Sequence, residues 1–165
     1  LRLALLTGQR IGEVVALRWA DVDTDERTWT IPAEDTKNGR IHRVPLSDPA
    51  LEILERRRQR PTAVVWAFPS PRGDSHLRSE SPGQALRAVR DKIGLPNCRA
   101  HDLRRTLATH IGRQEGVDRV LVGKILNHTD RTVTAVYDRY ERDDEKRAAL
   151  EEWGRRVMEV VNAEE

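Results

Sequence analysis

Hydrophobic residues recur at helical spacing along most of the chain. Residues 1–6 have the pattern of the end of a helix closed by Gly8, because glycine readily adopts the left-handed conformation that follows a last helical turn. The same spacing predicts helices over residues 11–18, 48–58, 83–93, 102–114, 117–126 and 143–161. The last of these places Ala149, Trp153, Val157 and Val160 on one face, ready for burial.

Two segments have the character of strands instead. They are Arg27–Ile31 and Ile41–Leu46, and Asn38-Gly39 lies between them. Asn-Gly supplies the positive φ angles of a tight turn, so we predict a β-hairpin with Lys37 beside its tip. Residues 67–83 are rich in Pro, Ser and Gly and are expected to form a long surface loop. The predicted fold class is α+β, mainly α-helical, with a small antiparallel β-sheet near the N-terminal third.

Length and composition fit one compact domain of 165 residues. The chain begins at Leu1 inside an apolar run, so we expect the natural protein to continue upstream. No apolar run approaches the roughly 20 residues of a membrane span, and no secretion signal is visible. A single cysteine, Cys98, excludes an internal disulfide and fits a reducing cytoplasm.

Charge is unevenly distributed along the chain. Residues 141–165 carry nine acidic and five basic side chains, whereas the remaining residues carry 24 basic and 18 acidic ones. A basic body with an acidic tail is compatible with a nucleic-acid partner. A GC-rich genome would also produce an excess of arginine over lysine, so the charge alone does not show such a partner.

Five short motifs carry the chemistry of the chain. They are Thr7-Gly8-Gln9-Arg10, Thr36-Lys37-Asn38-Gly39-Arg40, His101-Asp102-Leu103-Arg104, Leu126-Asn127-His128 and Tyr137. Together they supply the cations that neutralise a phosphate, a proton donor and a nucleophile. No two histidines are three or four residues apart, Cys98 is alone, and Gly123-Lys124 lacks the remainder of a phosphate-binding loop. We therefore expect neither a metal ion nor another cofactor.

The order and spacing of these motifs resemble the catalytic domain of tyrosine recombinases, the phage integrase family. The resemblance runs from residue 1 to about residue 147. Residues 125–128, 136–140 and 145–150 are most similar to integrases of satellite phages and genomic islands. The commonest form of the family has glycine before the histidine, where this chain has Asn127. We expect a residue in the left-handed conformation after the helix over residues 117–126, and asparagine is the usual second choice after glycine there.

The resemblance implies a role for each motif. Arg10 and Arg104 would bind the scissile phosphate, His128 would hydrogen-bond it, and His101 would assist proton transfer. Glu13, one turn after Arg10, would either orient that arginine or remain a solvated carboxylate.

The same resemblance assigns the nucleophile and the acid. Tyr137 lies nine residues after His128, as in the family, whereas Tyr140 lies three residues too far. Tyr137 would form a 3′-phosphotyrosine link while Lys37 protonates the 5′-oxygen. Arg40 and Arg43 would contact the DNA backbone.

As a whole, residues 1–165 would be one catalytic domain of a site-specific DNA recombinase, with the N-terminal DNA-binding domain outside this sequence. The implied partners are double-stranded DNA attachment sites, further copies in a homo-tetramer on DNA, and accessory DNA-bending proteins. The last helix would dock on its own chain or on a neighbouring protomer. Two alternatives stay open: a type IB topoisomerase-like enzyme with the same site, and a non-catalytic DNA-binding protein derived from an integrase.

Overall fold

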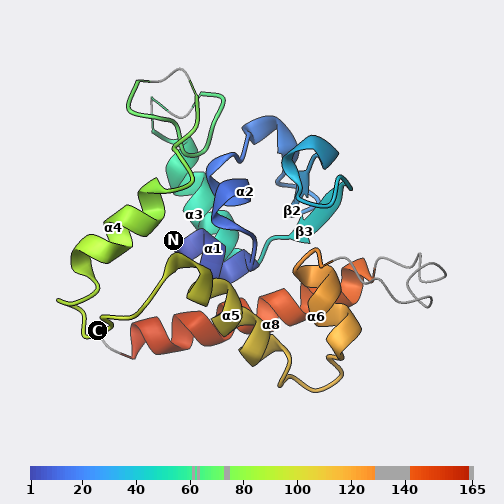
Figure 1. Ribbon diagram of the computed structural model, residues 1–165. Coiled ribbons are helices and arrows are strands. Elements are labelled where there is room, and N and C mark those ends of the chain that lie inside the picture. Colours follow the sequence, from blue (N-terminus) through green and yellow to red (C-terminus); the bar gives the residue numbers. More distant parts are fainter. Residues whose placement is uncertain (61, 63, 73–74, 129–141, 164–165) are drawn as a thin grey trace.

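The computed structural model describes residues 1–60, 62, 64–72, 75–128 and 142–163 (Figure 1). Its helices are α1 (Arg2–Thr7), α2 (Ile11–Val15), α3 (Asp48–Arg58), α4 (Ser81–Val89), α5 (Ala100–Ile111), α6 (Arg119–Ile125) and α8 (Asp143–Asn162). Of two short 3₁₀ helices, η1 (Trp19–Asp21) precedes the first strand and η2 (Ala33–Asp35) lies between the second and third strands. In the part of the chain that is described, no helix is both long enough and apolar enough to cross a membrane.

A three-stranded antiparallel sheet lies in the N-terminal third. Its strands are β1 (Val22–Asp23), β2 (Thr28–Ile31) and β3 (His42–Pro45), in the order β1-β2-β3. In the β2–β3 pair, Trp29 is opposite Val44 and Ile31 is opposite His42. The predicted fold class is confirmed, although the sequence did not predict β1, which has only two residues.

The predicted β-hairpin is confirmed by the antiparallel pairing of β2 and β3, but its tight Asn38-Gly39 turn was a wrong prediction. Residues 32–41 form a longer connection between β2 and β3, and η2 occupies its first part. Gly39 has a φ of 66°, but Asn38 is not among the residues with positive φ. A two-residue turn of this kind needs positive φ at both positions, so the geometry of a longer loop replaces it.

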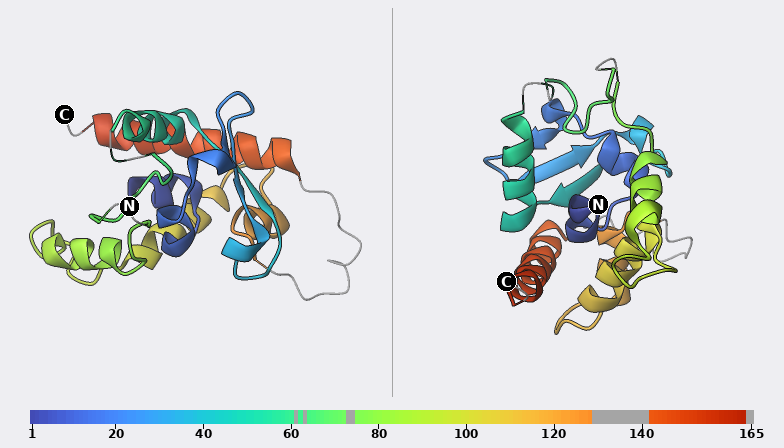
Figure 2. Two further views of the ribbon diagram at one scale, coloured as in Figure 1. Left: turned by 90° about the horizontal axis from the view of Figure 1, so that it is seen from above. Right: turned by 90° about the vertical axis from the view of Figure 1, so that its left-hand side faces the viewer.

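Two hydrophobic clusters build the core. The first joins α1, α3 and the sheet around Leu6, Trp29 and Leu54, and the second joins α5, α6 and α8 around Leu107 and Leu150. The right-hand view of Figure 2 shows the sheet and α3 in one half of the molecule and α5 and α8 in the other. Helix α1 contacts α3, α5 and α8 and so belongs to both halves.

Helix α8 packs against its own chain along most of its length. Ala149 and Trp153 are buried, and the Trp153 indole Nε1 donates a hydrogen bond of 2.8 Å to Leu5 O. Val157 is partly buried, as predicted, but Val160 is 60% exposed, so its predicted burial was wrong. Residues 159–163 are all exposed, because no other element covers the last turn.

Several helix limits differ from the prediction. Helix α2 stops at Val15, and Arg18 instead pairs with Trp66 in a β-bridge. Helix α4 begins at Ser81, inside the predicted loop, with a proline in its first turn, where the missing N–H leaves no bond unmade. Helix α5 ends at Ile111, just before Gly112.

Candidate active site

The C-terminal end of α6 is a well-formed helix stop. Asn127 has a φ of 50°, its N–H donates to Lys124 O at 3.1 Å, and the His128 N–H donates to Gly123 O at 2.9 Å. This pair of bonds is the Schellman pattern, in which a left-handed residue turns the chain sharply away from the helix. The predicted left-handed conformation of Asn127 is confirmed, and it places His128 at the outer edge of the turn.

Two carbonyls of the same helix end accept bonds from distant parts of the chain. Ile125 O accepts from Gln9 Nε2 at 2.9 Å and lies 3.2 Å from His42 Nε2. Leu126 O accepts from Arg104 Nη2. The last carbonyls of a helix have no partner within it, so buried side chains must satisfy them here. The position of His128 therefore depends on residues from four separate segments.

Arg104 connects two chain turns from inside the protein. Arg104 is only 5% exposed. Its Nη1 donates a hydrogen bond of 2.6 Å to Gly8 O, and its Nη2 donates one to Leu126 O. Burial, followed by the positive charge of Arg10, lowers the pKa of Arg104 to about 10, and Glu13 opposes the shift. The guanidinium stays charged at neutral pH, with its orientation fixed by two backbone carbonyls.

The α1–α2 connection presents Arg10 next to this buried arginine. Gly8 has a φ of 68°, and a Cβ at this position would lie 2.8 Å from Leu107 Cδ2, so only glycine fits without strain. Arg10 Nη1 lies 2.8 Å from Glu13 Oε1, and the Arg10 N–H donates to Glu13 Oε2 at 2.8 Å. Glu13 is buried and contacts both the backbone N–H and the guanidinium of Arg10. Glu13 therefore orients Arg10 and is not a solvated carboxylate.

The two predicted histidines belong to the same electrostatic group. His101 lies in the first turn of α5, one helical turn before Arg104, and its side chain is exposed. Burial, and then the positive charges of Arg104, Arg10 and His101, lower the pKa of His128. A neutral imidazole is therefore favoured before an anion binds, and a bound phosphate would oppose this shift by favouring the charged form.

Lys37 lies on the β2–β3 connection, which reaches the end of α6. Its side chain is exposed, and the next residue, Asn38, donates from Nδ2 to Asn127 Oδ1 at 2.6 Å. The lysine that the sequence predicts as an acid is thus carried beside the segment that holds His128.

The fold brings together most of the predicted site residues. Arg10, His101, Arg104 and His128 gather around the ends of α1 and α6, and Lys37 is tied to them through Asn38. Tyr137, the predicted nucleophile, lies outside the described residues, as does Tyr140.

Of the two predicted DNA contacts, Arg40 lies on the same β2–β3 connection and Arg43 lies in β3. Arg40 is exposed, and Arg43 points outward from β3 with its Nε 3.3 Å from Asp143 Oδ2. To contact DNA, Arg43 would have to leave this ion pair. The loss would cost little, because ion pairs between exposed side chains are weak. Arg105, the neighbour of Arg104 in the chain, is exposed and pairs with Asp102 at 3.3 Å.

The buried polar side chains that contact the end of α6 were not predicted from the sequence. Gln9 is 1% exposed and bonds Thr7 O as well as Ile125 O, and His42 is 5% exposed. The alternation of residues along β3 could have indicated the burial of His42. His42 lies two residues before the apolar Val44, with the charged Arg43 between them, and alternate residues of a strand face the same side. Gln9 gave no comparable signal, because it stands between two motif residues and has no periodic pattern around it.

The burial of His42 predicts an acid-sensitive fold. Burial, and then the positive charge of Lys146, lower the pKa of His42 from 6.5 to about 4. Between these two pH values His42 is therefore protonated in the unfolded chain and neutral in the folded chain. The free energy of unfolding should therefore fall as pH decreases through this window, by about 2 kcal/mol between pH 7 and pH 5 from this residue. Urea unfolding of His42→Gln should show a correspondingly smaller loss between these pH values. The exposed His101→Gln is the matched control, and an equal loss in wild type and His42→Gln would refute the prediction.

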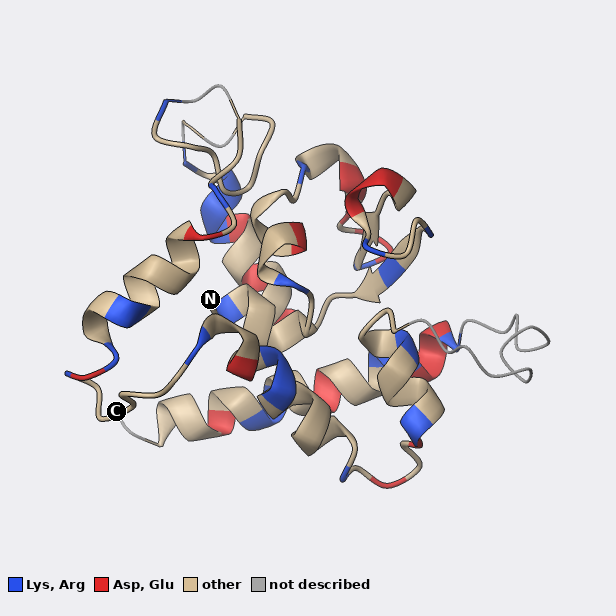
Figure 3. Ribbon diagram, in the orientation of Figure 1, with Lys and Arg blue, Asp and Glu red and all other residues tan. Residues whose placement is uncertain are grey.

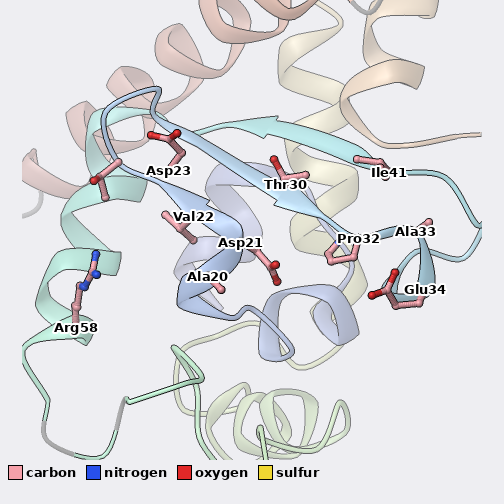
Figure 4. A pocket seen from close by; sticks show the side chains of 11 residues that line it. Ala20, Asp21, Val22, Asp23, Thr30, Pro32, Ala33, Glu34, Ile41 and Arg58 are labelled. Carbon is pink, nitrogen blue, oxygen red and sulfur yellow. The ribbon is translucent and has the colours of Figure 1, made fainter.

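A hollow in the described part of the chain has none of the predicted site residues in its lining. It measures about 660 Å³ and lies beside the sheet, lined among others by Asp21, Asp23, Glu34 and Ile41 (Figure 4). Figure 3 shows the acidic ribbon segments at η1 and η2 in the same region. Carboxylates repel a phosphate, so the candidate site is the arginine and histidine group and not this hollow. Among the described residues, no cluster of His, Cys, Asp or Glu could hold a metal ion.

Comparison with known proteins identifies the class to which this fold and site belong. Residues 1–144 match the phage integrase family. Because this match covers most of the chain, the protein belongs to the phage integrase family, the tyrosine recombinases, and carries the catalytic-domain fold of that family.

Individual relatives agree with this assignment. The chain is 30% identical over 152 residues to the prophage integrase IntA of Escherichia coli K12, covering 90% of this chain and 36% of the relative. Among solved structures, the integrase from mycobacterium phage Brujita has a TM-score of 0.67 at 29% identity, over 90% of this chain and 48% of that one.

A solved DNA complex has the same fold. The Tn1549 transposon integrase in complex with circular intermediate DNA has a TM-score of 0.63 at 19% identity, over 90% of this chain and 55% of that one. The present chain therefore spans only about a third to a half of these relatives.

Proposed function

We propose that this chain is the catalytic domain of a site-specific DNA recombinase that cleaves and rejoins strands through a 3′-phosphotyrosine intermediate. The observation that supports this most directly is the buried Arg104, held by Gly8 O and Leu126 O beside Arg10 and His128. Cations that are fixed in place before the substrate arrives stabilise the charge of a phosphoryl transition state without further reorganisation.

The proposed reaction follows from this arrangement. Arg10, Arg104 and His128 bind the non-bridging oxygens of the scissile phosphate, and Tyr137 attacks phosphorus. The phenol proton leaves with help from His101, while the bond to the 5′-oxygen breaks and Lys37 protonates that oxygen. The phosphotyrosine bond keeps the energy of the broken bond, so a 5′-hydroxyl from a partner strand can reverse the step.

The partners belong to the same proposal. The substrate would be double-stranded DNA with attachment sites, on which the full-length protein assembles as a homo-tetramer, aided by DNA-bending proteins. Arg40 and Arg43, both exposed beside Lys37, would contact the DNA backbone. The sequence similarity around His128 and Tyr140 favours a satellite-phage or genomic-island integrase, acting in the cytoplasm.

A covalent trapping assay tests the proposal. The full-length protein is incubated with a nicked suicide duplex that spans the junction between the mobile element carrying its gene and the host DNA. An adduct that survives denaturation is expected, attached through a 3′-phosphate. Binding without any adduct would favour a non-catalytic DNA-binding protein. An adduct that forms equally on unrelated DNA and relaxes supercoils would favour a topoisomerase-like enzyme.

A further inference from the structure

A single side-chain contact joins the Lys37 connection to the turn that holds His128. Asn38 Nδ2 donates to Asn127 Oδ1 at 2.6 Å, between residues that are 89 positions apart in the sequence. Both asparagines are half-buried. From the sequence, Asn38 and Asn127 were expected only to allow the backbone conformation of their turns, and their side chains had no predicted role.

The hydrogen bonds around Asn38 fix the orientation of its amide. Asn38 Oδ1 accepts from the Arg40 N–H at 3.2 Å, which leaves Nδ2 as the group that faces Asn127. In the described part of the chain, Asn127 Nδ2 is buried and has no hydrogen-bond partner. A buried donor without a partner is unfavourable, so packing for stability alone does not account for asparagine at this position.

The connection around Lys37 is itself held closed. Thr36 Oγ1 accepts from the Arg40 N–H at 3.1 Å and lies 2.9 Å from both Arg40 O and Ala33 O. Residues 36–40 therefore form a compact turn, and the contact with Asn127 sets where this turn lies relative to α6.

Asn127 serves the site in two ways. With a φ of 50°, it occupies a conformation in which glycine is free of strain and asparagine is tolerated. Glycine would provide the backbone turn but no bond to Asn38. The side chain of Asn127 thus adds a link that the helix stop does not require.

We propose that Asn38 and Asn127 are a positioning pair that holds Lys37 at the leaving oxygen of a phosphate bound by His128. This inference rests on the proposed function, in which Lys37 is the acid. The pair transmits the position of the phosphate-binding turn to the acid through one hydrogen bond. Loss of either side chain should weaken proton delivery and leave phosphate binding intact.

The test compares two leaving groups. Single-turnover cleavage is measured with the full-length protein on the same suicide duplex, carrying either oxygen or sulfur at the 5′-bridging position. A thiol has a pKa of about 8.5, so a thiolate leaves without an acid, whereas an alkoxide does not. Asn38→Ala and Asn127→Gly should each slow the oxygen substrate roughly five- to tenfold, the effect of one hydrogen bond, and leave the sulfur substrate unchanged.

The double variant and controls separate this role from a structural one. Asn38→Ala/Asn127→Gly should be no slower than either single variant, because all three lack the same bond. Asn162→Ala, an exposed asparagine at the end of α8, should cleave both substrates at the wild-type rate. Asn variants that slow both substrates equally, or that show additive effects, would overturn the positioning role.

Lys37→Ala distinguishes failure of the inference from failure of the proposed function. This variant should be severely slowed on oxygen and restored by sulfur. If sulfur restores Lys37→Ala but both asparagine variants cleave the oxygen substrate normally, the inference is wrong and the proposed function stands. If sulfur fails to restore Lys37→Ala, the proposed acid is wrong and the inference falls with it.

Discussion

Replacing Tyr137 with phenylalanine is expected to abolish the covalent adduct with DNA, by at least ~10⁴-fold in the rate of its formation. The phenol oxygen of Tyr137 is the proposed nucleophile, and phenylalanine has no oxygen with which to form a bond to phosphorus. The measurement is the single-turnover yield of denaturation-resistant adduct on the suicide duplex, with DNA binding measured in parallel. Binding should remain close to wild type, because phosphate contacts across the whole interface carry the affinity.

Tyr140→Phe is the matched control for the nucleophile. These are the two tyrosines of the chain, three residues apart, and they could share one face of a helix. We expect Tyr140→Phe to form the adduct normally. The reverse result, an adduct lost with Tyr140→Phe and kept with Tyr137→Phe, would move the nucleophile to Tyr140.

Arg104→Ala is expected to reduce cleavage on the order of 10³-fold and also to destabilise the fold. Its removal leaves Gly8 O and Leu126 O without their buried donor, and a cavity replaces the side chain. The expected loss of unfolding free energy is about 3 kcal/mol, measured by urea denaturation at pH 7. Arg104→Lys should keep the positive charge but lose the planar guanidinium that reaches both carbonyls, and so restore neither cleavage nor stability fully.

Arg105→Ala provides the control on the same helix. Arg105 is exposed and pairs with Asp102 on the surface, so we expect a change within about 0.5 kcal/mol and nearly normal cleavage. An Arg104→Ala protein as stable as wild type would show that the two backbone bonds are not made in solution. Normal cleavage by that variant would remove Arg104 from the proposed site.

The loss of both cleavage and stability expected for Arg104→Ala could not be predicted from the sequence. From spacing alone, Arg104 is a cation on the same helical face as His101, and its loss should affect the phosphate only. Its contacts with Gly8 O and Leu126 O join segments that are 96 and 22 residues away in the chain. Such contacts depend on how α1, α5 and α6 pack, and no local pattern contains that information.

The β2–β3 connection illustrates the same limit in the opposite direction. Asn38-Gly39 predicted a tight turn, because local preference favours positive φ there. In the fold, the loop instead closes through Thr36 and contacts Asn127, and tertiary contacts override the local preference.

The sequence by itself determined the helical class, the left-handed turns at Gly8 and Asn127, and the order of the candidate residues. These follow from local rules: apolar spacing, backbone freedom and motif distance along the chain. Only the tertiary structure decided that Arg104 is buried between two carbonyls, that Gln9 and His42 hold the end of α6, and that Asn38 reaches Asn127. Each of these requires a donor and an acceptor from segments distant in the sequence to meet, and only the packed chain brings them together.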